Sequence, residues 1–171
     1  MNGTPRRLDS GGRINREHTL RFKLDGRLLA GCGGDSLASA VLANGITLVG
    51  RSFKYHRPRG ILSAGIEEPN ALVAVGEGAR TDTNSRATMV ELHDGLVARS
   101  LNNWPSLSFD LSSVNNLVSG FLGAGFYYKT FMWPRALWHA LYEPAIRRMA
   151  GIGEAPQGAD PDRYDKVHRH C

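Results

Sequence analysis

Cysteine is scarce in this sequence, which contains only Cys32 and Cys171. Neither a disulfide framework nor a cluster held by four thiolates can therefore form within one chain. Long apolar runs are missing too, because no stretch approaches the roughly 18 residues that a membrane span needs. The start, MNGTPRRLDSGGRINREH, lacks the apolar centre of a signal peptide. We therefore expect a cytoplasmic protein that does not contact a membrane.

Negative charge is missing from one segment in particular, RSFKYHRPRG at 51–60, which we call the basic loop. Its guanidinium, ammonium and aromatic groups are those that bind phosphates or stack on a nucleotide base. The net charge of +5 also suits an anionic partner. We predict that the loop contacts a cofactor or another subunit through Arg51, Lys54, Tyr55, His56, Arg57 and Arg59. Two alternatives are a solvated surface and neutralisation of the loop by Glu67 and Glu68.

Alternation and turn residues predict an α+β domain over residues 18–103. Leu20, Phe22 and Leu24 alternate with basic residues and lead to Asp25-Gly26, a strong signal for a β-hairpin. A buried helix follows, and it takes Asp35 or Ser36 as its cap and ends at Asn44-Gly45.

Further strands are predicted after this helix, at 46–50, at 70–76 and as a pair over 88–100 that turns at Asp94-Gly95. Two strands, one helix and more strands indicate an α+β roll, which is compatible with a β-grasp sheet wrapped on one helix.

Residues 104–152 have a helical pattern rich in aromatic residues. Apolar residues recur at helical spacing over 112–123, and Pro134 and Pro144 suit the first turns of later helical segments. Half of the aromatic residues of the chain lie between Phe126 and Tyr142. Because protein interfaces prefer aromatic residues at their centres, we expect an interface at Phe126, Tyr127, Tyr128, Phe131, Trp133 and Trp138. An ordinary helical core is the alternative.

The two ends of the chain have the composition of connecting segments. Residues 1–17 are predicted to form a flexible arm, and 153–171 a linker. The terminal HRHC carries His168, His170 and Cys171, but a zinc site needs four convergent ligands and the spacing supplies no such set. We predict neither a metal site nor a catalytic residue in this chain.

Several separated segments, in order, carry a resemblance to a known family: FKLDGRLLAGCGGDSLASAVLANGITLVGRSFKYHRPRGILSAGIEEPNALV, SLNNWPSLSFDL, FYYKTFMWP and DPDRYDKVHRHC. Over residues 18–171 the chain resembles the N-terminal region of the alpha subunit of heterotetrameric sarcosine oxidase. The resemblance implies a ferredoxin-like β-grasp domain, a helical extension and a linker to a dinucleotide-binding domain that lies beyond this fragment.

The resemblance also bears on a two-iron two-sulfur cluster. In cluster-bearing relatives the ligand cysteines fall in the loop after the helix and strand. Here that loop carries Ser63, Ala64, Glu68 and Ala71, and no cysteine. We therefore expect a ferredoxin-like scaffold without a cluster.

The family's reaction is the oxidative demethylation of sarcosine to glycine. The resemblance implies FAD, FMN, NAD and tetrahydrofolate in the complete complex, none of them bound by this segment alone, and partners in the rest of the alpha subunit and in beta, gamma and delta subunits. The segment is expected to position its neighbours without catalysing. Two alternatives are a subunit of a related amine or amino-acid dehydrogenase, and a stand-alone module that stacks single-stranded nucleic acid on Tyr55.

Overall fold

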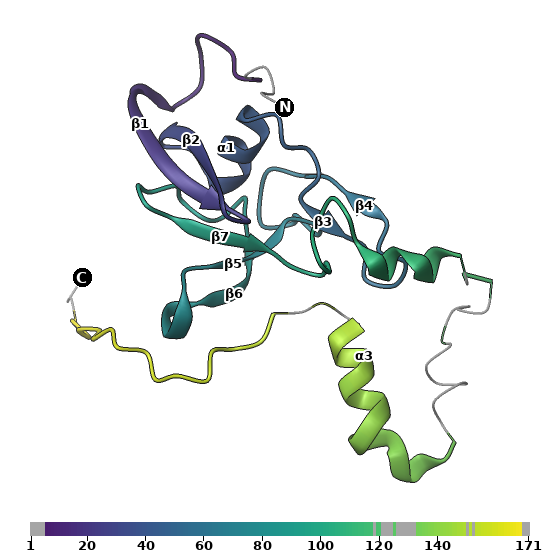
Figure 1. The fold of residues 1–171 in the computed structure, drawn as a ribbon. Helices are drawn as coiled ribbons and strands as arrows, with labels where there is room; N and C mark the ends of the chain where they lie inside the picture. The colour runs from purple at the N-terminus through teal and green to yellow at the C-terminus, as the bar shows by residue number, and fades with distance from the viewer. Residues whose placement is uncertain are drawn as a thin grey trace.

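The computed structural model describes residues 6–117, 119–120, 125, 133–149, 151 and 153–168. A five-stranded sheet, in the order β2-β1-β7-β5-β6, organises the first hundred residues (Figure 1). Its strands are β1 (Asn15–Leu24), β2 (Arg27–Gly33), β5 (Leu72–Val75), β6 (Asp82–Arg86) and β7 (Val97–Ser100). The β1–β7 pair is parallel and the other pairs are antiparallel. A mixed sheet with few helices is α+β, as predicted.

The predicted hairpin is confirmed as β1 and β2. Asp25 and Gly26 both have positive φ angles, +50° and +76°, which a tight two-residue turn between twisted strands requires. Leu20, Phe22 and Leu24 are buried while their neighbours on β1 are exposed. The alternation of the sequence therefore marks the core face of the sheet.

The helix α1 (Leu37–Ala43) packs on that face and completes the core. Ser36 caps it by accepting a hydrogen bond from the Ser39 backbone N–H, so Ser36, rather than Asp35, is the cap. The buried residues of the helix are Leu37, Ala38, Ala40 and Val41, and they form one cluster with core residues of the sheet. Each large apolar side chain that is fully buried in this way contributes about 1.5 to 3 kcal/mol.

The strand predicted over 46–50 is wrong for most of its length. Only Gly50–Arg51 (β3) is a strand, and it pairs with Pro58–Arg59 (β4) in a separate two-stranded sheet. Val49 is buried in the core although it lies in a loop. Ile46 packs against the core as well, so the apolar residues Ile46 and Val49 of this segment contribute to the core without forming a strand.

The strand pair predicted over 88–100 is half wrong. Its second part is β7, which pairs with β1 and β5, but residues 88–93 do not form a strand. The other neighbour of β5 is β6, whose sequence DTNSR is polar and shows no alternation. The predicted turn connects to β1 instead: the Gly95 N–H donates to the Arg21 carbonyl at 2.7 Å, and the Arg21 N–H donates to the Asp94 carboxylate at 2.8 Å.

The described part of the predicted arm, residues 6–17, is attached to the domain. The Arg7 guanidinium donates two hydrogen bonds to Asp35, at 3.1 and 2.6 Å, and the Arg6 N–H donates to the Ala43 carbonyl at 3.0 Å. Strand β1 begins at Asn15, inside the predicted arm.

Short helical segments follow the sheet: η2 (Leu111–Asn116, a 3-10 helix), η3 (Arg135–Leu137, 3-10), η4 (Trp138–Tyr142, a π-helix) and α3 (Glu143–Met149). Figure 1 shows α3 standing apart from the sheet. Of the apolar stripe predicted over 112–123, Val114 is 57% exposed and Leu117 83% exposed. Val118, Phe121 and Leu122 lie outside the described residues.

The chain after α3 returns to the sheet and runs beside β6 (Figure 1). The Asn84 side chain accepts a hydrogen bond from the Gly153 N–H at 3.1 Å and donates to the Gly153 carbonyl at 3.4 Å. Arg80, which ends the 3-10 helix η1 (Gly78–Arg80), forms an ion pair with Asp162 at 2.8 Å. Part of the predicted linker is thus held against the domain.

Candidate functional site

The basic loop is a closed hairpin between β3 and β4. Backbone hydrogen bonds join Ser52 N–H to the Arg57 carbonyl at 2.9 Å and His56 N–H to the Ser52 carbonyl at 3.0 Å. His56 adopts a positive φ of 52°, and its ring turns into the protein. The loop therefore has a defined shape before any partner arrives.

Arg51 braces the loop from inside. Its guanidinium donates to the Leu107 carbonyl, from Nε at 3.0 Å and from Nη2 at 2.6 Å, and to the His56 carbonyl at 3.0 Å. These acceptors are neutral and belong to the protein's own backbone. Arg51 therefore connects the basic loop to the segment before η2, and its charge is only half-exposed at the surface.

His56 is buried against Asp110. The distance from Nδ1 to the Asp110 Oδ2 is 2.7 Å, and the two side chains are 6% and 0% exposed. Asp110 Oδ1 also accepts hydrogen bonds from the backbone N–H groups of Trp104 and Ser112, both at 3.1 Å. The pair thus fastens the loop to the start of η2.

The Tyr55 ring contacts two cations of its own loop. The Lys54 ammonium is 4.9 Å from the ring centroid and the Arg57 guanidinium is 4.8 Å from it. Arg57 is exposed and also donates from Nε to the Asn116 side chain at 3.1 Å. These cation–π contacts engage the ring on which the nucleic-acid alternative depends.

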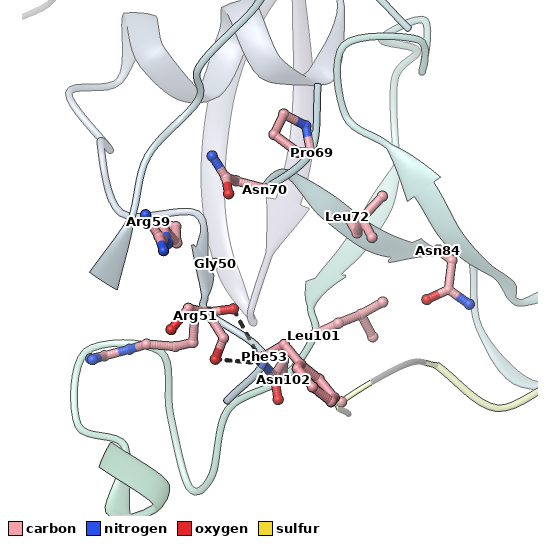
Figure 2. A pocket seen from close by; sticks show the side chains of 12 residues that line it. Gly50, Arg51, Phe53, Arg59, Pro69, Asn70, Leu72, Asn84, Leu101 and Asn102 are labelled. Carbon is pink, nitrogen blue, oxygen red and sulfur yellow. Dashed lines mark hydrogen bonds between the residues drawn. The ribbon is translucent and has the colours of Figure 1, made fainter. Parts of the chain in front are cut away.

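Arg59 is exposed and faces a cavity of about 290 Å³ (Figure 2). Asn70 and Asn102 line the same cavity, and the Asn102 amide donates to the carbonyls of Arg51 and Ser52, at 3.2 and 3.3 Å, as the dashed lines show. A guanidinium beside side-chain amides favours a polar or anionic group. A larger cavity, about 750 Å³, is lined by His56, Trp104 and Asn102 among others.

The predicted site residues of the basic loop thus differ in exposure. Arg51 and His56 hold the loop, Lys54 and Tyr55 are half-buried, and Arg57 and Arg59 are exposed. Glu68 does not neutralise the basic loop, because its carboxylate accepts backbone N–H groups of its own loop. Sequence reasoning missed Asp110 and Asn102, which lie about 50 residues from their partners and belong to no motif.

The predicted interface aromatics are only partly within the described residues. Trp133 is 84% exposed and Trp138 is half-buried in η4. Phe126, Tyr127, Tyr128 and Phe131 lie outside the described residues.

Among the described residues, no three His, Cys, Asp or Glu side chains converge as a metal site would require. His170 and Cys171 of the terminal HRHC lie outside the described residues. None of the described helices has the length and apolar character to cross a bilayer.

Comparison with known proteins defines the class of this domain. Residues 17–103 match the family described as 2Fe-2S iron-sulfur cluster binding domain. The match covers half of the sequence, and the chain belongs to this family.

Particular relatives are alpha subunits of sarcosine oxidase, and the predicted resemblance is confirmed. The chain is 63% identical over 165 residues to sarcosine oxidase subunit alpha of Rhizobium meliloti, which covers 96% of this chain and 17% of the relative. It is 48% identical over 101 residues to the protein of that name from Corynebacterium sp. (strain U-96), covering 55% of this chain and 10% of the relative. The chain thus spans less than a fifth of these relatives.

A solved structure, that of L-proline dehydrogenase from P. horikoshii, is similar at 21% identity, with a TM-score of 0.42, over 58% of this chain and 17% of that chain.

The cluster named by the family does not fit the residues of this chain. Cluster irons take thiolate ligands, or imidazole in some centres, but the loop before β5 offers the Ser63 hydroxyl and the Glu68 carboxylate, and no thiol or imidazole. The carboxylate is already buried and bonded inside that loop. The chain thus belongs to the family but carries a hydroxyl and a carboxylate, and no thiolate, in this loop.

Proposed function

We propose that this chain is the structural and assembly segment of a sarcosine oxidase alpha subunit, within an oxidoreductase complex that oxidatively demethylates sarcosine to glycine in the cytoplasm. The observation that carries the proposal is the identity to the Rhizobium meliloti subunit along nearly the whole chain. The closed, internally braced basic loop supports a positioning role, because its inward side chains stabilise architecture and not a reacting group.

The proposal assigns a β-grasp, ferredoxin-like domain to residues 18–103. The hairpin β1–β2, the helix α1 and the parallel pairing of β1 with β7 support it, since together they wrap one sheet around one helix. The proposal also assigns a helical extension to residues 104–152, and to residues 153–171 a linker to a dinucleotide-binding domain.

The exposed groups supply the contacts with neighbours. Arg57 and Arg59 present guanidinium groups to a partner surface or cofactor, whereas the helical extension presents apolar side chains such as Leu117 and Trp133. A group of exposed apolar side chains is typical of a surface that a partner covers. The partners are the remaining alpha-subunit domains and the beta, gamma and delta subunits, and FAD, FMN, NAD and tetrahydrofolate belong to the complete complex.

The experiment that tests this proposal is Arg57→Glu in the complex. The full chain carries an affinity tag and is co-produced with the remaining domains and subunits. We expect the charge reversal to lower the yield of co-purified subunits and the flavin absorbance per chain several-fold, because the exposed guanidinium faces an acidic or phosphate group of a neighbour. The far-UV circular dichroism of the chain stays unchanged.

The matched control is Arg27→Glu, which makes the same charge change on an exposed position of β2, away from the basic loop. It is expected to leave assembly intact. Equal subunit yield and flavin content for Arg57→Glu and the unsubstituted complex contradict the assembly role of the loop. A colourless preparation without partners, from the unsubstituted chain, contradicts the sarcosine oxidase assignment itself.

A further inference from the structure

The loop before β5 closes around one carboxylate. The Glu68 side chain is 0% exposed. Its Oε2 accepts the backbone N–H groups of Leu62 and Ser63 at 2.7 and 2.6 Å, and its Oε1 accepts those of Asn70 and Ala71 at 2.8 and 3.2 Å. The Ser63 hydroxyl adds a contact to Oε2 at 3.4 Å. Four amide groups from both ends of the loop therefore converge on one anion.

This anion has no cationic partner among the ion pairs of the described residues. Burial raises the pKa of Glu68, but the hydrogen bonds from Ser63, Asn70, Leu62 and Ala71 outweigh burial and hold the pKa below its ordinary value. A buried carboxylate is costly unless hydrogen bonds replace its hydration. Convergent backbone N–H groups are a recognised way to do so, since successive amides form concave anion sites.

The Glu68 carboxylate lies in the loop that leads into β5. Ser63, Glu68 and Ala71 lie in the loop where, as the family resemblance implies, cluster-bearing relatives carry their ligand cysteines. Here the backbone N–H groups of Ser63 and Ala71 both donate to the Glu68 carboxylate. An iron–sulfur cluster carries its negative charge on sulfurs that accept hydrogen bonds from the surrounding protein. Glu68 brings a negative charge to the same loop from within the chain.

We propose that the loop of residues 62–71 is an anion-binding site whose ligand is the protein's own Glu68 carboxylate, in place of an inorganic cluster. The four amides define its specificity: a planar carboxylate with two oxygens, each taking two N–H groups. When the side chain is cut back, the vacated site takes a small free carboxylate, formate or acetate. The inference concerns the fold and does not depend on the proposed function.

The test is chemical rescue of Glu68→Ala in the full chain. Thermal unfolding is recorded with increasing sodium formate and, at equal ionic strength, with sodium chloride. We expect a fall in Tm of roughly 10 °C, because four buried amides lose their acceptor, and a saturable recovery with formate but not with chloride. The matched control is Glu67→Ala, which removes an exposed carboxylate of the same loop and is expected to behave like the unsubstituted chain.

Three results overturn the proposal: a Glu68→Ala chain as stable as the original, a destabilised Glu68→Ala chain that formate does not recover, or the same formate response in all chains. If Glu68→Ala does not fold, Glu68→Gln keeps the shape and loses the charge. Its amide exchange at Leu62, Ser63 and Asn70 is expected to be at least tenfold faster than in the unsubstituted chain, with no formate effect because the amide still fills the site. Unchanged exchange at these positions refutes the inference.

Discussion

Replacing Arg7 by methionine is expected to destabilise the sheet domain, although Arg7 lies in a segment that the sequence predicts as an arm. Its guanidinium donates Nη1 to Asp35 Oδ1 at 3.1 Å and Nη2 to Oδ2 at 2.6 Å. The two side chains are 21% and 0% exposed. Hydrogen bonds to charged groups contribute about 1.5 to 3 kcal/mol. Because the guanidinium is partly solvated, we expect Arg7→Met to cost about 2 kcal/mol, near the lower end.

Removing Asp35, the other member of the pair, is expected to lower the free energy of unfolding further. Asp35 also accepts hydrogen bonds from the Cys32 N–H and the Ser39 hydroxyl, both at 2.8 Å. Truncating one member of a buried ion pair typically costs about 3 to 5 kcal/mol, so we expect Asp35→Ala to fall in that range. Since the pair is lost in either variant, the double substitution is expected to be less destabilising than the sum, by about 1 to 2 kcal/mol.

The assay is urea unfolding of the full chain followed by circular dichroism, because urea leaves ionic strength unchanged. Arg13→Met removes an exposed arginine from the same segment and is the matched control. The reasoning is refuted if Arg7→Met, like the control Arg13→Met, changes the free energy of unfolding by less than about 0.5 kcal/mol, since the pair of Arg7 with Asp35 would then not stabilise the fold.

Two further predictions follow from buried contacts. The pKa of Asp35 and that of Glu68 lie below their ordinary values of 3.8 and 4.5. The stability that these two carboxylates contribute is therefore fully present above their ordinary pKa values and is lost as the pH falls through the lower pKa of the folded state. Acid unfolding is expected to begin below about pH 4. A free energy of unfolding that stays constant from about pH 5 to 2 contradicts this prediction. Arg51→Lys keeps the charge but loses the two hydrogen bonds to the Leu107 carbonyl, so we expect the free energy of unfolding to fall by about 1 to 2 kcal/mol and the basic loop to be cleaved faster by protease. Arg59→Lys, the control at an exposed position, is expected to change neither the stability nor the rate of cleavage.

The parts of the fold that the sequence predicts correctly are those with a local signal. The β1–β2 hairpin combines strict alternation with Asp25-Gly26, and α1 has a capping serine before an apolar run. Strand β6 has neither, because the polar DTNSR is a strand only through its pairing with β5. The segment 46–49 shows the converse, because Val49 lies in the core and Ile46 packs against it although neither belongs to a strand.

The candidate site was predictable as a segment but not in its internal arrangement. The composition of the basic loop indicates a functional or structural role, yet nothing local says that Arg51 and His56 turn inward. Their partners, Leu107 and Asp110, are 56 and 54 residues away. The same holds for Glu68, since its acceptor role depends on how the loop closes around it.

The return of the chain along β6 has a consequence for how the domain behaves at high concentration. β6 is a terminal strand of the sheet, and terminal strands leave amide and carbonyl groups open to pairing with another molecule, a route to aggregation. Gly153, held by Asn84, and Asp162, held by Arg80, lay the following segment beside that strand. By lying beside β6, the described segment 153–168 therefore obstructs the pairing of this edge with another molecule.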